Sequence, residues 1–204
     1  MLSASNNITV SGEAALQKLI EGNNRYTSGK HLAKDLGAGR REELLKGQNP
    51  FAVILSCSDS RVPPEHLFDQ GLGDLFVVRT AGNVVDEIAI GSVEYAVEHL
   101  HTPLVVVMGH ENCGAVKAAV DGGEAEGSVG AIIGKIEPSL AKVKAAGAAG
   151  SMLYEAAADE NIMSTLGDLQ KSPVIQHLLA KGQLLLVGAK YHLGSGEVVF
   201  NTSK

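Results

Sequence analysis

The stretch Phe-Ala-Val-Ile-Leu-Ser-Cys-Ser-Asp-Ser-Arg at residues 51–61 determines the fold and the position of a candidate site. Its apolar residues, followed by small polar ones, indicate a buried strand that delivers side chains at its carboxyl end. Residues 103–108 form a second apolar run, which leads into Gly-His-Glu-Asn-Cys-Gly at residues 109–114. Open α/β sheets place ligand sites at the carboxyl ends of their strands. Both cysteines of the chain therefore lie where such a site is expected.

Strand-like and helix-like patterns alternate along the chain. This alternation predicts an α/β fold, with a mainly parallel central sheet of about four strands plus an antiparallel edge strand, flanked by helices. The expected strands lie at residues 51–56, 74–79, 104–108, 184–188 and, after a hairpin turn, within 191–200. The expected helices lie at residues 11–28, 39–46, 64–68, 86–100, 113–120, 129–170 with a break near 147–150, and 173–181.

Residues 11–46 precede the first strand and are predicted to form an N-terminal helical arm of a single domain that spans residues 1–204. Ser11 is a good N-cap, and apolar side chains recur after it at three- and four-residue intervals. Two arrangements are open for this amphipathic helix: it packs on a partner subunit or on its own domain.

Composition narrows the classes of function. The formal net charge is −6, and no cluster of Lys and Arg is present, which argues against a nucleic-acid surface. No apolar run approaches the roughly 18 residues that would suggest a membrane span. The first ten residues lack the pattern of a signal peptide, so we expect a cytoplasmic protein with a small-molecule partner, although a targeting peptide that had been removed would leave no trace.

Cys57, His110 and Cys113 form a candidate metal-ligand set at the two strand ends. Two thiolates and an imidazole suit Zn²⁺, and three protein ligands leave a fourth position open, as in catalytic zinc sites. We therefore expect one zinc ion per chain. The alternative for such residues is two inert buried thiols and a histidine that is satisfied by hydrogen bonds.

Asp59 and Arg61 follow Cys57 in the same loop. A zinc ion that keeps a water ligand lowers the pKa of that water from about 15.7 to about 7. Asp59 would accept a hydrogen bond from this water, and Arg61 would keep the carboxylate ionised. Two alternatives are a plain surface ion pair and Asp59 as a fourth zinc ligand that closes the site.

The motif from Cys57 to Arg61, together with His110-Glu111-Asn112-Cys113-Gly114, closely resembles the β-class carbonic anhydrases. The resemblance extends from the first helix to the last strand. It implies a zinc lyase (carbonate dehydratase) that reversibly hydrates carbon dioxide to bicarbonate, with Cys57, His110 and Cys113 as ligands. It also implies Asp59 and Arg61 as a catalytic dyad, and a homodimer or homotetramer.

The same resemblance assigns roles to further positions. Gln48 matches a glutamine that donates to a substrate oxygen from the neighbouring subunit. His99 matches a histidine proposed to relay protons in plant-type members. The substrate pocket is assigned to four residues, with the backbone amide of the last one close to the substrate: Phe76, Ala81, Tyr95 and Gly114.

Two departures from the family pattern bear on the subgroup. Many plant-type members have a larger aliphatic residue at the position of Ala81, so a more open apolar wall is expected here. Members with an allosteric bicarbonate site carry a tryptophan at the position of Ile54, and this chain has no tryptophan. We therefore expect the plant-type, open site with water at the zinc and without bicarbonate inhibition.

Three rival functions share parts of this pattern. Hydrolysis of carbonyl sulfide or carbon disulfide uses the same ligands on related folds. A non-catalytic bicarbonate sensor would not need Asp59, Arg61 and Gln48. An alcohol-dehydrogenase-like oxidoreductase also uses two cysteines and a histidine, but it should carry a dinucleotide fingerprint, and residues 71–74 (Gly-Leu-Gly-Asp) lack the third glycine.

Overall fold

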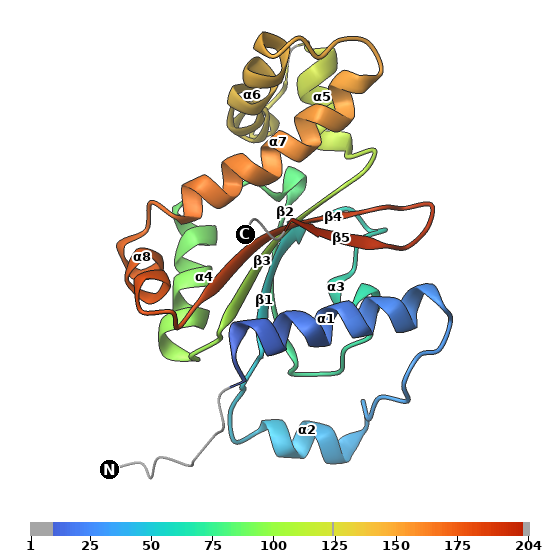
Figure 1. Cartoon of the computed structure of the whole chain (residues 1–204), viewed down its shortest axis with the longest axis vertical. Coiled ribbons are helices and arrows are strands. Elements are labelled where there is room, and N and C mark those ends of the chain that lie inside the picture. The colour runs from blue at the N-terminus through green and yellow to red at the C-terminus, as the bar shows by residue number, and fades with distance from the viewer. Residues whose placement is uncertain (1–9, 124, 202–204) are drawn as a thin grey trace.

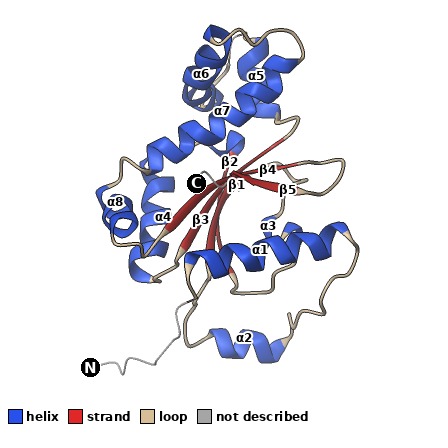
Figure 2. Ribbon diagram, viewed as in Figure 1, coloured by secondary structure: helices blue, strands red, loops and turns tan. Residues whose placement is uncertain are grey.

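The computed structural model describes residues 10–123 and 125–201 of the chain. Its centre is a five-stranded sheet in the order β2-β1-β3-β4-β5, which confirms the predicted α/β fold (Figures 1 and 2). The first four strands are parallel, and β5 runs antiparallel to β4. The strands are β1 (Ala52–Cys57), β2 (Leu75–Thr80), β3 (Leu104–His110), β4 (Leu185–Tyr191) and β5 (Val198–Asn201).

Helices surround this sheet and follow the predicted positions closely. The segment predicted at residues 129–170 is two helices, separated near Gly147 and Gly150 as the sequence indicates. The helices are α1 (Gly12–Thr27), α2 (Ala38–Leu44), α3 (Pro64–Leu67), the 3-10 helix η1 (Ala81–Asn83), α4 (Glu87–His99), α5 (Gly114–Asp121), α6 (Val129–Ala145), α7 (Met152–Leu169) and α8 (Pro173–Ala180).

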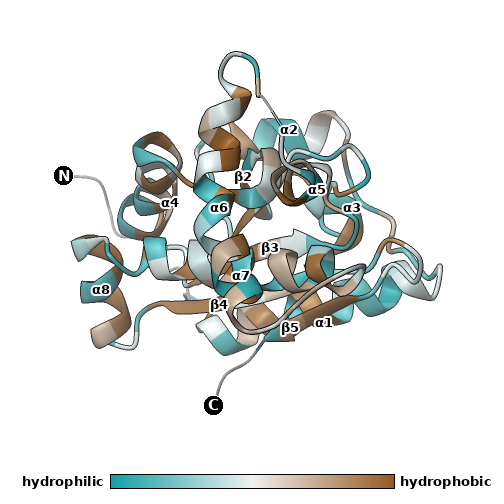
Figure 3. Cartoon of the chain, turned by 90° about the horizontal axis from the view of Figure 1, so that it is seen from above, coloured by the Kyte–Doolittle hydropathy of each residue, from teal (hydrophilic) through white to brown (hydrophobic). Residues whose placement is uncertain are grey.

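The two faces of the sheet bury alternate residues of each strand, as the pleat requires. Ile54 and Val106 face a core completed by α1 and α3. Val53 and Val107 face a second core completed by α4, α7 and α8. The surrounding helices carry both hydrophobic and hydrophilic residues (Figure 3), as expected for elements with one face on the sheet.

A third core lies beyond the carboxyl ends of the strands, where α5, α6 and α7 gather (Figure 1). Ile136 and Ala157 are completely buried in it, and both cysteines belong to it. The two strand ends that the sequence singles out are therefore covered by packed helices.

The N-terminal arm divides into two parts. Ser11 caps α1 through a hydrogen bond from the Ala14 amide, and α1 buries Ala15 and Leu19 on the sheet of its own chain. Helix α1 therefore packs on the sheet of its own domain, and contact of its remaining faces with a partner subunit stays a prediction. Helix α2 buries no residue, so contact of this part of the arm with a partner subunit stays a prediction.

Strand β2 forms the outer edge of the sheet, next to β1. Its apolar residues are only partly buried, and within the described part of the chain no strand pairs with its free edge. None of the described helices is both long and apolar enough to cross a membrane.

Candidate metal centre

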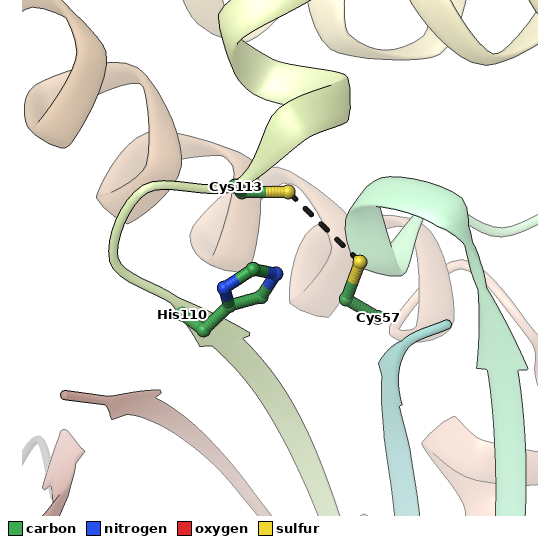
Figure 4. Close-up of side chains that lie close together, drawn as sticks. All are labelled: Cys57, His110 and Cys113. Carbon is green, nitrogen blue, oxygen red and sulfur yellow. Dashed lines mark hydrogen bonds between the residues drawn. The ribbon is translucent and has the colours of Figure 1, made fainter. Parts of the chain in front are cut away.

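Three side chains meet at the carboxyl edge of the sheet. Cys57 ends β1 and His110 ends β3, and these neighbouring parallel strands bring both residues to the same edge. Cys113 follows after a tight turn as the N-cap of α5. The three ligand atoms lie within 4.8 Å of one another, all three residues are buried, and their side chains point toward a common centre (Figure 4).

The chemistry of this set fits a zinc ion. The Cys57 and Cys113 sulfurs are 3.9 Å apart, too far for a disulfide. Two zinc–sulfur bonds of about 2.3 Å at a tetrahedral angle span about 3.8 Å. Nε2 of His110 is buried and has no hydrogen-bond partner among the described residues, whereas Nδ1 lies 2.9 Å from the Glu111 carbonyl oxygen. With the proton on Nδ1, the Nε2 lone pair is directed at the metal position, which is the arrangement of metal-binding histidines.

The surroundings favour a thiolate at Cys57. The hydrogen bond from the Cys113 thiol, helped by the Gly82 amide and opposed by burial, lowers the pKa of Cys57 to about 4. The Gly82 N–H donates to the Cys57 sulfur at 3.2 Å. The hydrogen bond to Cys57, together with burial, raises the pKa of Cys113. A metal cation would bind both sulfurs as thiolates and displace their protons.

Asp59 and Arg61 form a bidentate ion pair beside the ligands. Arg61 Nε donates to Oδ1 at 2.9 Å and Nη2 donates to Oδ2 at 2.7 Å. These hydrogen bonds lower the pKa of Asp59, so the carboxylate is ionised at neutral pH. Asp59 Oδ2 also lies 3.9 Å from Nε2 of His110. The carboxylate is therefore next to the metal position, with both of its oxygens held by Arg61.

The sequence reading missed Arg79, which fixes the loop between the ligand and the dyad. Arg79 Nε donates to the Cys57 carbonyl oxygen at 3.0 Å, and its Nη2 donates to the Asp59 carbonyl oxygen at 2.6 Å. Arg79 lies opposite Ser56 in the β1–β2 register. The sequence does carry a signal for Arg79, because a charged residue stands at the end of an otherwise apolar strand. The backbone carbonyl oxygens of Cys57 and Asp59 explain why a donor lies there.

Two of the predicted pocket residues lie beside the ligands. Gly114 is the first residue of α5, directly after Cys113, and it is exposed. Ala81 begins η1 and precedes Gly82, whose amide contacts the Cys57 sulfur. The chain thus places a helix N-terminus and a small apolar residue at the metal centre.

The other predicted residues lie elsewhere within one chain. Phe76 pairs with Val53, four residues before Cys57, which is about 13 Å away along the strand. Tyr95 on α4 packs on Phe76, with ring centroids 6.2 Å apart, and His99 packs on Tyr95 at 5.4 Å. Gln48 is exposed in the turn before β1. The chain therefore does not bring these four residues to its own metal centre: Gln48, Phe76, Tyr95 and His99.

A buried group of two cysteines and a histidine at the carboxyl edge of a parallel sheet, with an ionised carboxylate beside it, is typical of the metal centres of zinc enzymes. A family model described as carbonic anhydrase matches residues 52–198. The chain belongs to the carbonic anhydrase family, and the solved structures that it resembles place it in the β class.

Curated relatives and solved structures agree. The chain is 45% identical over 190 residues to the carbonic anhydrase of Mycolicibacterium smegmatis, with 91% of each chain covered. It is 41% identical over 191 residues to carbonic anhydrase 2 of Mycobacterium tuberculosis, again with 91% of each covered. The structure of the β-carbonic anhydrase CcaA matches with a TM-score of 0.74 at 31% identity, covering 91% of this chain and 94% of that one. The family predicted from the two motifs is confirmed.

Proposed function

We propose that this protein catalyses the reversible hydration of carbon dioxide to bicarbonate and a proton, with one zinc ion per chain held by Cys57, His110 and Cys113. The observation that carries the proposal is the unpartnered, buried Nε2 of His110, grouped with two sulfurs that are 3.9 Å apart. When bound, zinc supplies the Lewis acidity that lowers the pKa of a water molecule to about 7.

Asp59 orients the nucleophile in this proposal. Its carboxylate is ionised because Arg61 donates to both of its oxygens. An ionised carboxylate accepts a hydrogen bond from the attacking hydroxide, which directs the free lone pair of the hydroxide at the carbon of carbon dioxide. Arg61 holds Asp59 in place for this role.

The substrate oxygens face the start of α5. The backbone amide of Gly114 is at the positive end of this helix, where negative charge that develops on the substrate is stabilised. Ala81 supplies part of the apolar wall on the side of Cys57. A small side chain here leaves room for a linear, apolar substrate.

We also propose that the site is open to water at the fourth zinc position. The bidentate pair with Arg61 supports this arrangement, because a carboxylate that bound the metal would have to give up at least part of that pair. Ile54 is buried in β1 at the position where bicarbonate-regulated members carry tryptophan.

The remaining predicted residues are proposed to complete the site of a second copy, in a homodimer or a larger assembly such as a tetramer. Strand β2 is an apolar edge that is only partly buried, and such edges are sites of pairing with another chain. Phe76 and Tyr95 lie along this edge, and Gln48 precedes the neighbouring strand. His99 would take part in proton relay from the same patch.

The test is a zinc determination on the purified protein combined with stopped-flow hydration of carbon dioxide from pH 6 to pH 9. The proposal predicts one zinc per chain and turnover that shows no steep loss as the pH falls below about 8. The loss should come only near pH 7, because about 7 is the pKa expected for zinc-bound water. A parallel assay with carbonyl sulfide identifies the rival hydrolase. Bound zinc with no turnover of either gas would contradict the proposal and favour a sensor.

A further inference from the structure

Helix α7 runs between the sheet and helices α5 and α6 (Figure 1), and it makes hydrogen bonds to two loops beside the metal centre although it contributes no ligand. On one side, Asn161 Nδ2 donates to the Gly82 carbonyl oxygen at 2.7 Å, and Thr165 Oγ1 donates to the Asn83 carbonyl oxygen at 3.2 Å. Asn161 is only 1% exposed. A buried amide of this kind is costly unless its hydrogen bonds are made, so its partner at η1 is a specific feature of the fold.

The η1 turn needs such a support. Gly82 has φ +71°, a conformation that side chains disfavour. A Cβ at this position would also lie 3.0 Å from Ile136 Cδ1 and 3.1 Å from Ala115 Cβ. The amide of Gly82 donates to the Cys57 sulfur, so the orientation of this residue decides whether the ligand atom keeps that hydrogen bond.

On the other side, α7 holds the loop between the remaining two ligands. Glu155 Oε1 accepts a hydrogen bond from the Asn112 amide at 3.1 Å. Asn112 has φ +53°, and its left-handed turn lets His110 and Cys113 point to the same centre. The hydrogen bond to Glu155 helps to hold this turn, because a strained turn persists only where its surroundings fix it.

Lys190 fixes Glu155 in turn. Its Nζ lies 2.7 Å from Glu155 Oε2 and 2.8 Å from Asp159 Oδ1, and its side chain is only 13% exposed. An ammonium group that is largely withdrawn from water is stabilised by these two carboxylates. Helix α7 is thereby tied to β4 as well as to the ligand loop.

The helix lies close against the sheet beside a ligand. Ile162 is buried over Gly109, the residue before His110. A Cβ at Gly109 would lie 2.7 Å from Ile162 Cγ1, so only glycine allows this approach. This close packing fixes the distance between α7 and the sheet. That distance determines which backbone atoms the side chains of Asn161 and Glu155 can contact.

We propose that α7 is the positioning element of the metal centre, in which Asn161 sets the Gly82 amide toward the Cys57 sulfur and Glu155 sets the loop from His110 to Cys113. This inference rests on the proposed zinc site. The competing explanation is that both hydrogen bonds only stabilise the fold. The two explanations differ in what they predict for metal affinity.

For Asn161, zinc affinity measured by competition with a chromophoric chelator distinguishes a positioning role from a purely structural one. We expect Asn161→Ala to bind zinc about 10- to 100-fold more weakly, the usual effect of removing an outer-shell partner. Asn161→Leu, which is close in size and has no hydrogen-bonding group, should show the same loss and serves if the alanine variant does not fold.

Asn23→Ala is the matched control. Like Asn161, Asn23 is a buried asparagine whose side chain donates to backbone carbonyl oxygens, in this case those of Leu67 and Gly196. It lies on the other face of the sheet, away from the metal centre. Its loss should lower thermal stability and leave zinc affinity unchanged. Parent-like affinity in both Asn161 variants, or equal losses in the Asn161 and Asn23 variants, would overturn the proposal.

Glu155 allows a rescue experiment. Glu155→Ala removes the acceptor for the Asn112 amide and should weaken zinc binding, whereas Glu155→Gln keeps an acceptor oxygen and should restore most of the affinity. Cobalt(II) in place of zinc adds a second readout, because the thiolate-to-metal absorption band should shift in Asn161→Ala and not in Asn23→Ala. A parent protein that binds neither metal would refute the zinc site itself, whereas tight binding by the parent and all variants would refute only the role of α7.

Discussion

The carboxyl edge of the sheet and the outer edge at β2 are built in opposite ways. At the carboxyl edge, Cys57, His110 and Cys113 are buried and held by a network of hydrogen bonds. At β2, the aromatic cluster of Phe76 and Tyr95 is partly exposed, and the strand has a free edge. The comparison teaches that one chain assembles the ligands, the dyad and two of the predicted pocket residues, and leaves the other predicted residues at an exposed edge.

Removing a ligand should have the largest effect on the carboxyl edge. We expect Cys57→Ala to abolish zinc binding and carbon dioxide hydration, because two protein ligands do not hold zinc tightly. Zinc content by atomic absorption and stopped-flow activity measure both effects. Ser56→Ala is the control, since the Ser56 hydroxyl is buried without a hydrogen-bond partner among the described residues and should be dispensable. Zinc retained at the parent level in Cys57→Ala would refute the ligand assignment.

Asp59→Ala should separate chemistry from metal binding within the same edge. The three ligands are untouched, so zinc content should stay at one per chain. The turnover number should fall about 100-fold or more, the usual contribution of a positioned proton acceptor. Parent-level turnover would show that the Asp59–Arg61 pair is only an ion pair at the surface.

Shortening an aromatic side chain at the β2 edge should lower activity less than these substitutions, and without loss of zinc. We expect Tyr95→Ala to lower kcat/KM about tenfold with zinc content unchanged, because it removes an aromatic wall without touching a ligand. Val199→Ala is the control, since Val199 is an exposed apolar residue on the opposite edge strand. Equal changes in kcat/KM for Tyr95→Ala and Val199→Ala would contradict a specific role of the β2 edge in substrate binding.

The smallest expected effect concerns pH and stability. Arg61 lowers the pKa of Asp59 below its ordinary value of about 3.9. Because the folded pKa is depressed, the stabilisation from this pair is fully present above pH about 4 and is lost as the pH falls through the folded pKa. The difference in free energy of unfolding between the parent and Asp59→Asn should therefore shrink between pH 5 and about pH 3. Urea unfolding of the zinc-free proteins measures it, and a constant difference would contradict the assignment.

The sequence predicted the parts of the molecule that depend on local pattern. Strand order along the chain and the shared position of Cys57 and His110 follow from apolar runs whose carboxyl ends meet at one edge of a parallel sheet. The N-cap at Ser11 was equally readable. The prediction could not decide where α1 packs, because an amphipathic helix fits its own sheet and a partner subunit equally well.

Long-range polar contacts were beyond reach. Arg79, Asn161 and Glu155 act through backbone atoms 20 or more residues away along the chain. A backbone carbonyl leaves no mark on the sequence that identifies its donor. For α7 the usable signal was that Asn161 and Thr165, four residues apart, interrupt the apolar face of the helix. Such a pair predicts a buried polar contact without naming its partner.

Subunit complementation tests the division of the site most directly. Cys57→Ala lacks the metal half, and Gln48→Ala lacks a residue that is proposed to act in the neighbouring subunit. When the two variants are unfolded and refolded together, about a quarter of the sites should be intact in a symmetric dimer, and activity should rise well above the mean of the separate proteins. A mixture with only that mean activity would contradict the account, because both halves of the site would then come from one chain.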